Sequence, residues 1–334
     1  MMIPVSALVL LLDISPQDSV RKSLSLAEIT PSAVLFAEMA ARDGGEDALL
    51  LGRMLELSGR FNEAALYYGM ALEDVRDPET EAWLEQRRTG STPLDTVLVL
   101  QARITNKGSS TARGITLLMP LPVSHPPYQE IRILGGAFEA DSGFLVCKVD
   151  SLGAGERRNL PVFIRVEQHP FTYRPISMPP GFPGLESLGG ILRGIEIPAS
   201  FTGRGPCLDM SRELARLATQ AGFEVEVVGG LVGRGDSLIF HAWDILASGL
   251  PGMPLDPLLF KSDSLRAVGH CPTDVIPLWD LARGYELSVL YPSDQRGMEI
   301  GLRAFFLPFD PDSLGLPALL RFAAEPPGFR QDEF

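Results

Sequence analysis

Cysteine and clustered basic residues are scarce in this sequence, and each scarcity argues against a class of protein. Three cysteines, Cys147, Cys207 and Cys271, occur in 334 residues. Their odd number and wide spacing do not fit a disulfide framework, and the lack of a Cys-x-x-Cys pair argues against a structural zinc site. The formal net charge is −13, with no run of lysine and arginine. Nucleic acid is therefore not an expected partner, because binding to phosphates needs clustered cations.

Long apolar runs are also missing. The run from Met1 to Leu12 is apolar but shorter than the roughly 20 residues that a membrane-spanning helix needs. It resembles the middle of a secretory signal, although it lacks a basic start and a clear cleavage site. Residues 1–16 are either a signal remnant, which predicts a secreted or periplasmic protein, or a buried strand or helix of a cytoplasmic one. No other segment is apolar enough to predict an integral membrane span.

Residues 17–91 carry apolar side chains at helical spacing and are predicted to form a short helical region. Part of this region resembles one tetratricopeptide repeat, a helix–turn–helix unit of about 34 residues. The positions that carry the resemblance are Leu51, Gly52, Leu55, Gly59, Ala64, Tyr68 and Ala71, with Pro78 beyond. Two interpretations stay open. The region is either a module that binds a protein partner or an ordinary helical hairpin that packs on the rest of the chain.

Residues 92–168 change to the alternating apolar pattern of β-strands. The predicted strands, each bounded by turn residues, are Leu98 to Ile104, Ile115 to Met119, Leu145 to Val149 and Val162 to Val166. Short strands punctuated in this way predict a small β-sandwich. Cys147 falls in the middle of a strand, where we expect it to fill the core.

A proline- and glycine-rich linker, residues 169–200, precedes the segment that carries the candidate chemistry. Pro206 suits the first turn of a helix, and that helix is predicted to bury Cys207, Met210 and Leu214 on one face. Cys207 then lies at a helix N-terminus, where unpaired N–H groups and the helix dipole favour negative charge. A thiolate is the reactive form of cysteine, so this location suits a nucleophile. The same N–H groups suit the oxyanion of a tetrahedral intermediate.

Two strands are predicted after this helix, and the second carries a histidine. Phe223 to Val228 is the first, a glycine-rich loop follows, and Leu238 to Leu246 is the second. His241 shares one face of its strand with apolar residues, a setting in which histidine can act as a general base near neutral pH. Asp256 follows in a Leu-Asp-Pro segment, and a carboxylate bonded to the far ring nitrogen would orient the imidazole.

Together these motifs resemble the transglutaminase-like superfamily, a branch of the papain-like fold. The matching elements are Gly-x-Cys-x-Asp at a helix start, Ala-Gly-Phe before a valine-rich strand, His-Ala-Trp and Leu-Asp-Pro, in this order. The resemblance implies that Cys207 is the nucleophile, His241 the base and Asp256 the orienting acid, with Trp243 as a packing residue. Asp244, directly after His-Ala-Trp, differs from the family pattern.

The sequence therefore predicts an α+β protein. An apolar N-terminus (1–16) and a helical, repeat-like region (17–91) precede a β-sandwich (92–168). A papain/transglutaminase-like core with an antiparallel sheet and a C-terminal extension then occupies residues 169–334. In the extension, Val275 to Arg283 is expected to be helical, and strands at 285–291 and 299–306 are expected to continue the sheet of the preceding domain.

The first hypothesis for function is cysteine-dependent amide chemistry on a protein or peptide substrate, with no metal and no organic cofactor. Transfer of the acyl group to water, as in a peptidase or amidase, or to an amine, as in a transglutaminase, stays open. The alternative hypothesis is a catalytically degenerate adaptor that binds a protein partner. The adjacent His270 and Cys271 form a weaker rival site, because neighbouring side chains on a strand point apart.

Overall fold

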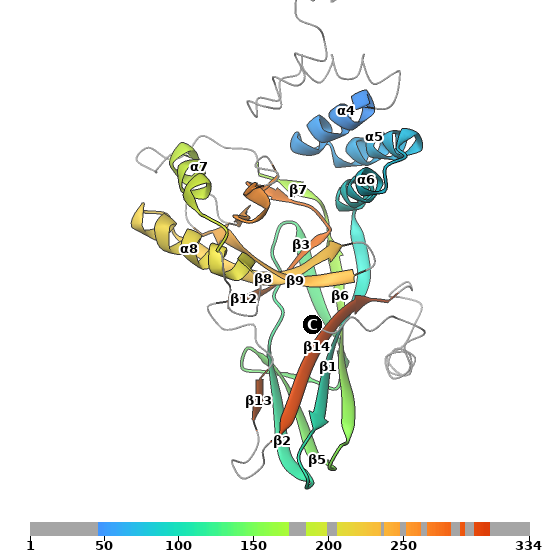
Figure 1. Ribbon diagram of the computed structural model, residues 1–334, viewed down its shortest axis with the longest axis vertical. Coiled ribbons are helices and arrows are strands. Elements are labelled where there is room, and N and C mark those ends of the chain that lie inside the picture. The colour runs from blue at the N-terminus through green and yellow to red at the C-terminus, as the bar shows by residue number, and fades with distance from the viewer. Residues whose placement is uncertain are drawn as a thin grey trace, which may run out of the picture.

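The computed structural model describes residues 46–173, 185–198, 206–234, 237–247, 252–261, 266–281, 288–290 and 297–307. The predicted apolar N-terminus and the helices expected before residue 46 lie outside these ranges. Figure 1 shows three parts: a group of helices at the N-terminal end, a central sheet flanked by two further helices, and an elongated pair of sheets at the opposite end.

The described residues form an α+β protein, as predicted, and their strand pairs are antiparallel. The helices are α4 (Glu46–Leu57), α5 (Phe61–Asp74), α6 (Pro78–Gly90), α7 (Leu185–Gly194) and α8 (Pro206–Gln220), with a 3-10 turn, η2 (Leu259–Lys261). The first strands are β1 (Leu94–Asn106), β2 (Ala112–Pro120), β3 (Gln129–Gly136), β4 (Glu139–Asp141), β5 (Phe144–Leu152), β6 (Arg157–Gln168) and β7 (Phe171–Thr172). The later strands are β8 (Val225–Arg234), β9 (Ser237–Leu246), β10 (Met253–Leu255), β11 (His270–Cys271), β12 (Val275–Asp280), β13 (Ser288–Leu290) and β14 (Met298–Phe306).

Helices α4, α5 and α6 pack against one another around a small apolar core of their own. In this core a small residue of α4, Gly52, contacts a large residue of α5, Tyr68, and both belong to the repeat-like pattern. The ring of Tyr68 lies on Gly52, where an added Cβ would come within 2.9 Å of the ring. Gly59, between α4 and α5, has a φ of 80°, which glycine adopts without strain. Binding of a partner by this region stays a prediction.

Two four-stranded sheets form the β-sandwich, in the orders β14-β1-β6-β3 and β13-β2-β5-β4. Apolar side chains from both sheets make one core, which includes Leu100 of β1, Leu117 of β2 and Ile164 of β6. Cys147 of β5 is buried in that core, as predicted. Apolar residues of the central sheet, among them Trp279, join the same core, so the sandwich supports the part of the molecule that carries the candidate site.

The last two strands of the described ranges complete the sandwich. Strand β14 pairs with β1 from Leu98↔Phe306 to Asn106↔Met298, and β13 pairs with β2. The sequence predicts both strands within the final domain, residues 169–334, where they continue the sheet of the preceding domain. Alternating apolar residues identify a strand but not the sheet edge that it joins. Here β14 joins the edge of β1, and β13 joins the edge of β2.

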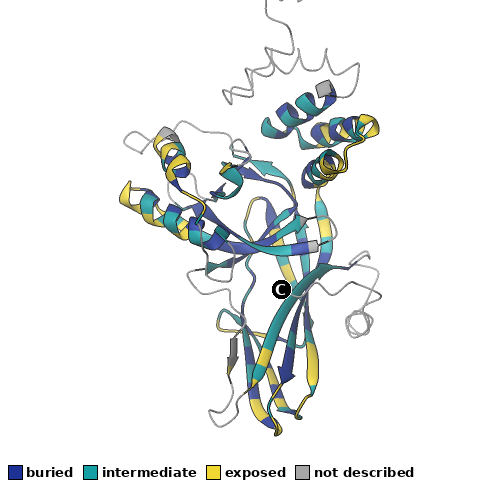
Figure 2. Cartoon of the chain, in the orientation of Figure 1, coloured by how far each residue is buried: buried dark blue, intermediate teal, exposed yellow. Residues whose placement is uncertain are grey.

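The third sheet, β10-β9-β8-β12, carries the candidate site. Helix α8 packs on one face of it, with Met210 and Leu214 against Leu246 and Leu255, and α7 packs beside α8 (Figure 1). In Figure 2, β8 and β9 are drawn mostly in the colours of buried and half-buried residues.

Two local predictions in this sheet are wrong. Strand β8 continues through Gly229 and Gly230, where a loop was expected. A Cβ on Gly230 would lie 2.6 Å from the ring of Trp243 and 2.1 Å from the carbonyl oxygen of Ile276, so this glycine serves close packing rather than a turn. The stretch expected to be a helix from Val275 contains strand β12 instead, because its β-branched and aromatic residues suit pairing with β8.

Within the described ranges, every helix is too short or too polar to cross a lipid bilayer.

Candidate active site

Helix α8 holds Cys207 at its N-terminal end. The helix begins at Pro206, as predicted, and Cys207, Met210 and Leu214 lie on its buried face. Cys207 is 7 % exposed and packs against Leu208 and Ala242. Its position in the first turn leaves the nearby backbone N–H groups without carbonyl partners inside the helix.

His241 lies in the middle of β9, opposite Gly230 of β8. Its ring stacks on that of Trp243, with centroids 5.8 Å apart and ring planes 26° apart. Trp243 in turn covers Gly230, so the glycine makes room for the indole that supports the imidazole. Trp243 therefore packs between His241 and Gly230.

Asp256 follows β10 and faces His241. One carboxylate oxygen, Oδ2, lies 2.7 Å from His241 Nε2. The other, Oδ1, accepts hydrogen bonds from the backbone N–H groups of Leu258 and Leu259, at 3.0 and 2.9 Å. Both carboxylate oxygens therefore have hydrogen-bond partners, and the carboxylate fixes the orientation of the His241 imidazole.

The sulfur of Cys207 completes this chain of contacts. It has a hydrogen bond with His241 and accepts from the backbone N–H groups of Ala242 and Leu208. Since Nε2 of His241 contacts Asp256, Nδ1 is the nitrogen left for Cys207. Strand β10 pairs with β9 only at Asp244 to Leu246, so Ala242 lies beyond the end of that pairing. The structure thus brings together all three residues that the sequence singled out.

The electrostatics favour a thiolate next to an imidazolium. Burial by itself would raise the pKa of the Cys207 thiol, but the hydrogen bond and charge of His241, with two backbone N–H groups, lower it. Burial would likewise lower the pKa of His241, but the charge and hydrogen bond of Asp256, together with Cys207, raise it to about 10. The two groups titrate as a pair, so one proton is shared between them over a wide pH range.

The rival pair, His270 and Cys271, is engaged elsewhere. His270 Nδ1 lies 2.8 Å from Thr172 Oγ1, and its Nε2 lies 3.0 Å from Glu56 Oε1. Burial raises the pKa of the Cys271 thiol, and Tyr128 counteracts this only in part. Burial also raises the pKa of Cys147. Cys207 is therefore the one of the three thiols whose surroundings favour the thiolate.

Sequence reasoning noted Asp244 only as a difference from the family pattern and did not predict that it is a buried carboxyl group near the site. Asp244 on β9 is fully buried, and neither of its oxygens nor the hydroxyl of the facing Ser211 has a hydrogen bond of normal geometry within the described residues. Burial raises the pKa of Asp244 well above its usual range, the Ser211 hydroxyl opposes this in part, and the charge of Asp256 adds to it. A charged residue within a strongly apolar strand was the available signal.

The raised pKa of Asp244 predicts a specific pH dependence of stability. The folded state retains a proton on Asp244 that the unfolded chain releases above its ordinary pKa of 3.8. Stability is therefore lost as pH rises from that value to the raised pKa, at about 1.4 kcal/mol per pH unit. Asp244→Asn cannot ionise, and we expect urea unfolding at pH 5 and pH 7 to show a less negative slope in this variant than in the wild type. An unchanged slope would contradict the protonated state.

A pocket of about 480 Å³ lies beside the site. His241, Trp243 and Asp256 line it, but Cys207 does not. The pocket adjoins the imidazole and carboxylate rather than the sulfur itself. In the part of the chain that the structure describes, no group of three or more His, Cys, Asp or Glu residues is arranged to hold a metal ion.

Comparison with known proteins adds little to this geometry. No family model matches the chain, and no curated protein matches it. Among solved structures, the chain is similar to a proposed cysteine protease from Cytophaga hutchinsonii. The identity is 13 % and the TM-score 0.36, over 66 % of this chain and 93 % of that one. A similarity at this level assigns neither a family nor an activity.

Proposed function

We propose that this protein carries out cysteine-dependent acyl transfer on amides, with Cys207 as nucleophile, His241 as general acid and base, and Asp256 as the residue that orients His241. The observation that carries the proposal is the contact chain from Cys207 through His241 to Asp256. A nucleophile next to a base that a third group orients is the arrangement that this chemistry needs. The papain- or transglutaminase-like core is part of the same proposal.

In the first half of the reaction, the Cys207 thiolate attacks the carbonyl carbon of an amide. A sulfur–carbon bond forms, and the carbonyl electron pair moves to the oxygen. Backbone N–H groups at the start of α8 would stabilise the resulting oxyanion. As the carbonyl re-forms, the carbon–nitrogen bond breaks and His241 gives its proton to the departing amine, which leaves a thioester on Cys207.

In the second half, a nucleophile attacks the thioester. His241 takes a proton from this nucleophile, the sulfur–carbon bond breaks, and the thiolate returns. Water as nucleophile makes the protein a hydrolase, and an amine makes it a transferase. Asp256 keeps Nδ1 of His241 directed at Cys207 in both halves and stabilises the positive charge on the ring.

An activated ester tests this proposal without knowledge of the natural substrate. We expect brief incubation with p-nitrophenyl acetate at pH 7 to acetylate Cys207, detectable by mass spectrometry of its peptide, with release of p-nitrophenol. The variant Cys207→Ala should lose at least about 90 % of the acylation, since the other two thiols have raised pKa values. The variant Cys147→Ala is the matched control and should keep it.

Acylation spread evenly over the three cysteines, or absent from Cys207, would contradict the proposal. That result would favour the adaptor hypothesis, in which the arrangement persists as a scaffold. Once an acyl-enzyme is seen, its decay in water and in water with added amines separates the hydrolase from the transferase.

A further inference from the structure

The pocket beside His241 has a chemical character that bears on the substrate. We propose that it binds a large apolar group, aromatic or branched aliphatic, that the substrate carries next to the amide attacked by Cys207. The inference rests on the proposed function and adds a substrate class to it. A volume of about 480 Å³ falls within the range of small-molecule sites, roughly 300–1,000 Å³.

Much of the pocket wall is apolar. Side chains from three neighbouring strands of the central sheet contribute to it: Val232 of β8, Ile239 and Trp243 of β9, and Val275 and Pro277 of β12. Ile197, after α7, lines the pocket as well and is 54 % exposed. An exposed apolar side chain at a pocket is more easily understood when a ligand covers it, because apolar surface gains free energy on leaving water.

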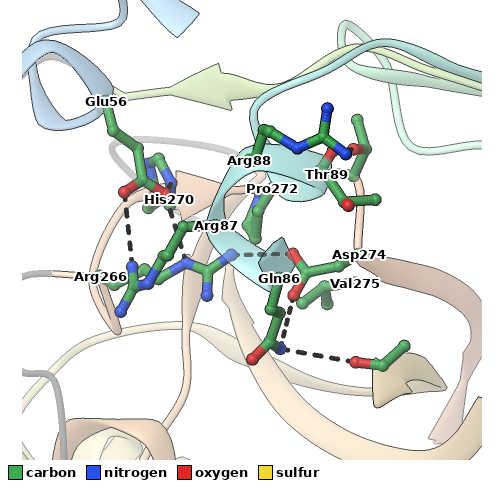
Figure 3. Close-up of polar contacts among 12 residues, drawn as sticks. Glu56, Gln86, Arg87, Arg88, Thr89, Arg266, His270, Pro272, Asp274 and Val275 are labelled. Atoms are coloured by element: carbon green, nitrogen blue, oxygen red, sulfur yellow. Dashed lines mark hydrogen bonds and ion pairs between the residues drawn. The ribbon is translucent and has the colours of Figure 1, made fainter. Parts of the chain in front are cut away.

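The polar side chains of the wall already have partners. His241 contacts Asp256, and Arg266 Nη2 donates to Asp274 Oδ1 at 2.8 Å. Gln86 Nε2 donates to Asp274 Oδ2 at 2.8 Å, and Figure 3 shows these groups turned toward one another. Lys261 lines the pocket too, and its Nζ donates to the backbone carbonyl oxygens of Leu192 and Arg193 at 3.4 and 3.2 Å. The carboxylates of the wall, Asp256 and Asp274, are already paired with His241 and Arg266, so a cationic group that entered would lose water without meeting an unpaired negative charge. The pocket therefore selects against cations.

The helical region supplies part of this wall. Gln86 belongs to α6, and its side chain reaches the central sheet, where Nε2 also lies 3.5 Å from the carbonyl oxygen of Gly233. The pocket is thus closed by α6 on one side and by the sheet on another. Helix α6 is therefore part of the proposed binding site.

A bound group would lie close to the reacting atoms. His241 and Asp256 line the pocket directly. Leu258 lines it too and also packs against the small apolar cluster of Cys207, Leu208 and Ala242, so one leucine side chain connects the pocket to the surroundings of the nucleophile. Substrate contacts at this distance can position the amide for attack.

Two alkylating reagents that differ only in an apolar tail test the inference. Iodoacetamide and N-phenethyl iodoacetamide both form a sulfur–carbon bond with the thiolate and release iodide. With rates normalised to those of glutathione, we expect Cys207 to react at least about tenfold faster with the tailed reagent. The variant Ile239→Asn should remove this preference, measured as the ratio of the two rates at Cys207. The variant Leu66→Asn is the control, because Leu66 is 63 % exposed on α5 and does not line the pocket.

The outcomes separate this inference from the proposed function. Fast reaction of Cys207 with iodoacetamide but no preference for the tail would overturn the inference alone. Slow reaction of Cys207 with both reagents, at the rate of Cys147, would overturn the proposed function and this inference with it. A preference that survives in Ile239→Asn would place the tail elsewhere and also overturn the inference. Should Ile239→Asn fail to fold, Val275→Asn repeats the test from the neighbouring strand.

Discussion

Replacing His241 with alanine should slow the alkylation of Cys207 by iodoacetamide by about two orders of magnitude at pH 6. The thiol pKa is lowered against the effect of burial by the hydrogen bond and charge of His241. Without His241, a thiol with an ordinary pKa of about 8.5 is ionised to only about 0.3 % at pH 6. Because only the thiolate reacts, the rate should fall by a similar factor. Rates are measured by mass spectrometry of the Cys207 peptide.

The pH profile sharpens this test. In the wild type, the rate should stay high from neutral pH downward until the lowered thiol pKa is reached, whereas in His241→Ala it should still be rising through pH 8. The variant His169→Ala is the matched control, because His169 is exposed and outside the site. If His241→Ala and His169→Ala gave the same profile as the wild type, Cys207 and His241 would not form an ion pair.

Replacing Glu56 with glutamine should destabilise the folded protein by about 3–5 kcal/mol. Glu56 is 1 % exposed. Its carboxylate accepts a hydrogen bond from Tyr68 Oη at 2.6 Å and has a second hydrogen bond with His270 Nε2 at 3.0 Å. Arg87 and Arg266 lie 3.4 and 3.5 Å from its oxygens. Burial alone would raise the pKa of Glu56, but His270, Arg266 and Arg87 lower it, so the carboxylate is charged. Its removal leaves buried cations short of a counter-charge, and urea unfolding measures the loss.

A surface residue of the same type provides the control. Glu63 of α5 pairs with Arg60 in an exposed position, and Glu63→Gln should change stability by less than about 1 kcal/mol. The lowered pKa of Glu56 also sets the direction of the pH effect. Its stabilising contribution is present above the ordinary pKa of 4.5 and is lost as pH falls toward the lowered value. Equal effects of the two substitutions would show that the Glu56 network contributes little to stability.

The candidate site could be predicted to the extent that its residues lie on local elements with clear patterns. Pro206 and the apolar spacing after it predict a helix that begins at Pro206 and carries Cys207 in its first turn. The His-Ala-Trp strand and the Leu-Asp-Pro turn lie 15 residues apart, and the antiparallel pairing of β9 and β10 brings His241 and Asp256 together. Short antiparallel connections leave few alternative arrangements, so sequence order largely determined the contact.

Other features could not be predicted because they depend on distant parts of the chain. Glu56 and His270 are 214 residues apart, and neither carries a local signal of the other. The alternating apolar residues of 299–306 predict a strand, but they do not predict that this strand pairs with β1. Gly230 was interpreted as a loop residue because glycine is common in turns, whereas packing against Trp243 and Ile276 required it within a strand.

The pairing of β1 with β14 has a consequence for the order in which the protein forms. Leu98 and Phe306 are neighbours in the sheet, yet more than 200 residues separate them. Closing so long a loop carries a large entropic penalty, and contacts of this kind form late in folding. On the ribosome, the edge of β1 stays unpaired until nearly the whole described chain has been made. The segment that bears Cys207, His241 and Asp256 emerges before the strand that finishes its support, so we expect the candidate site to be fully supported only after β14 has been made.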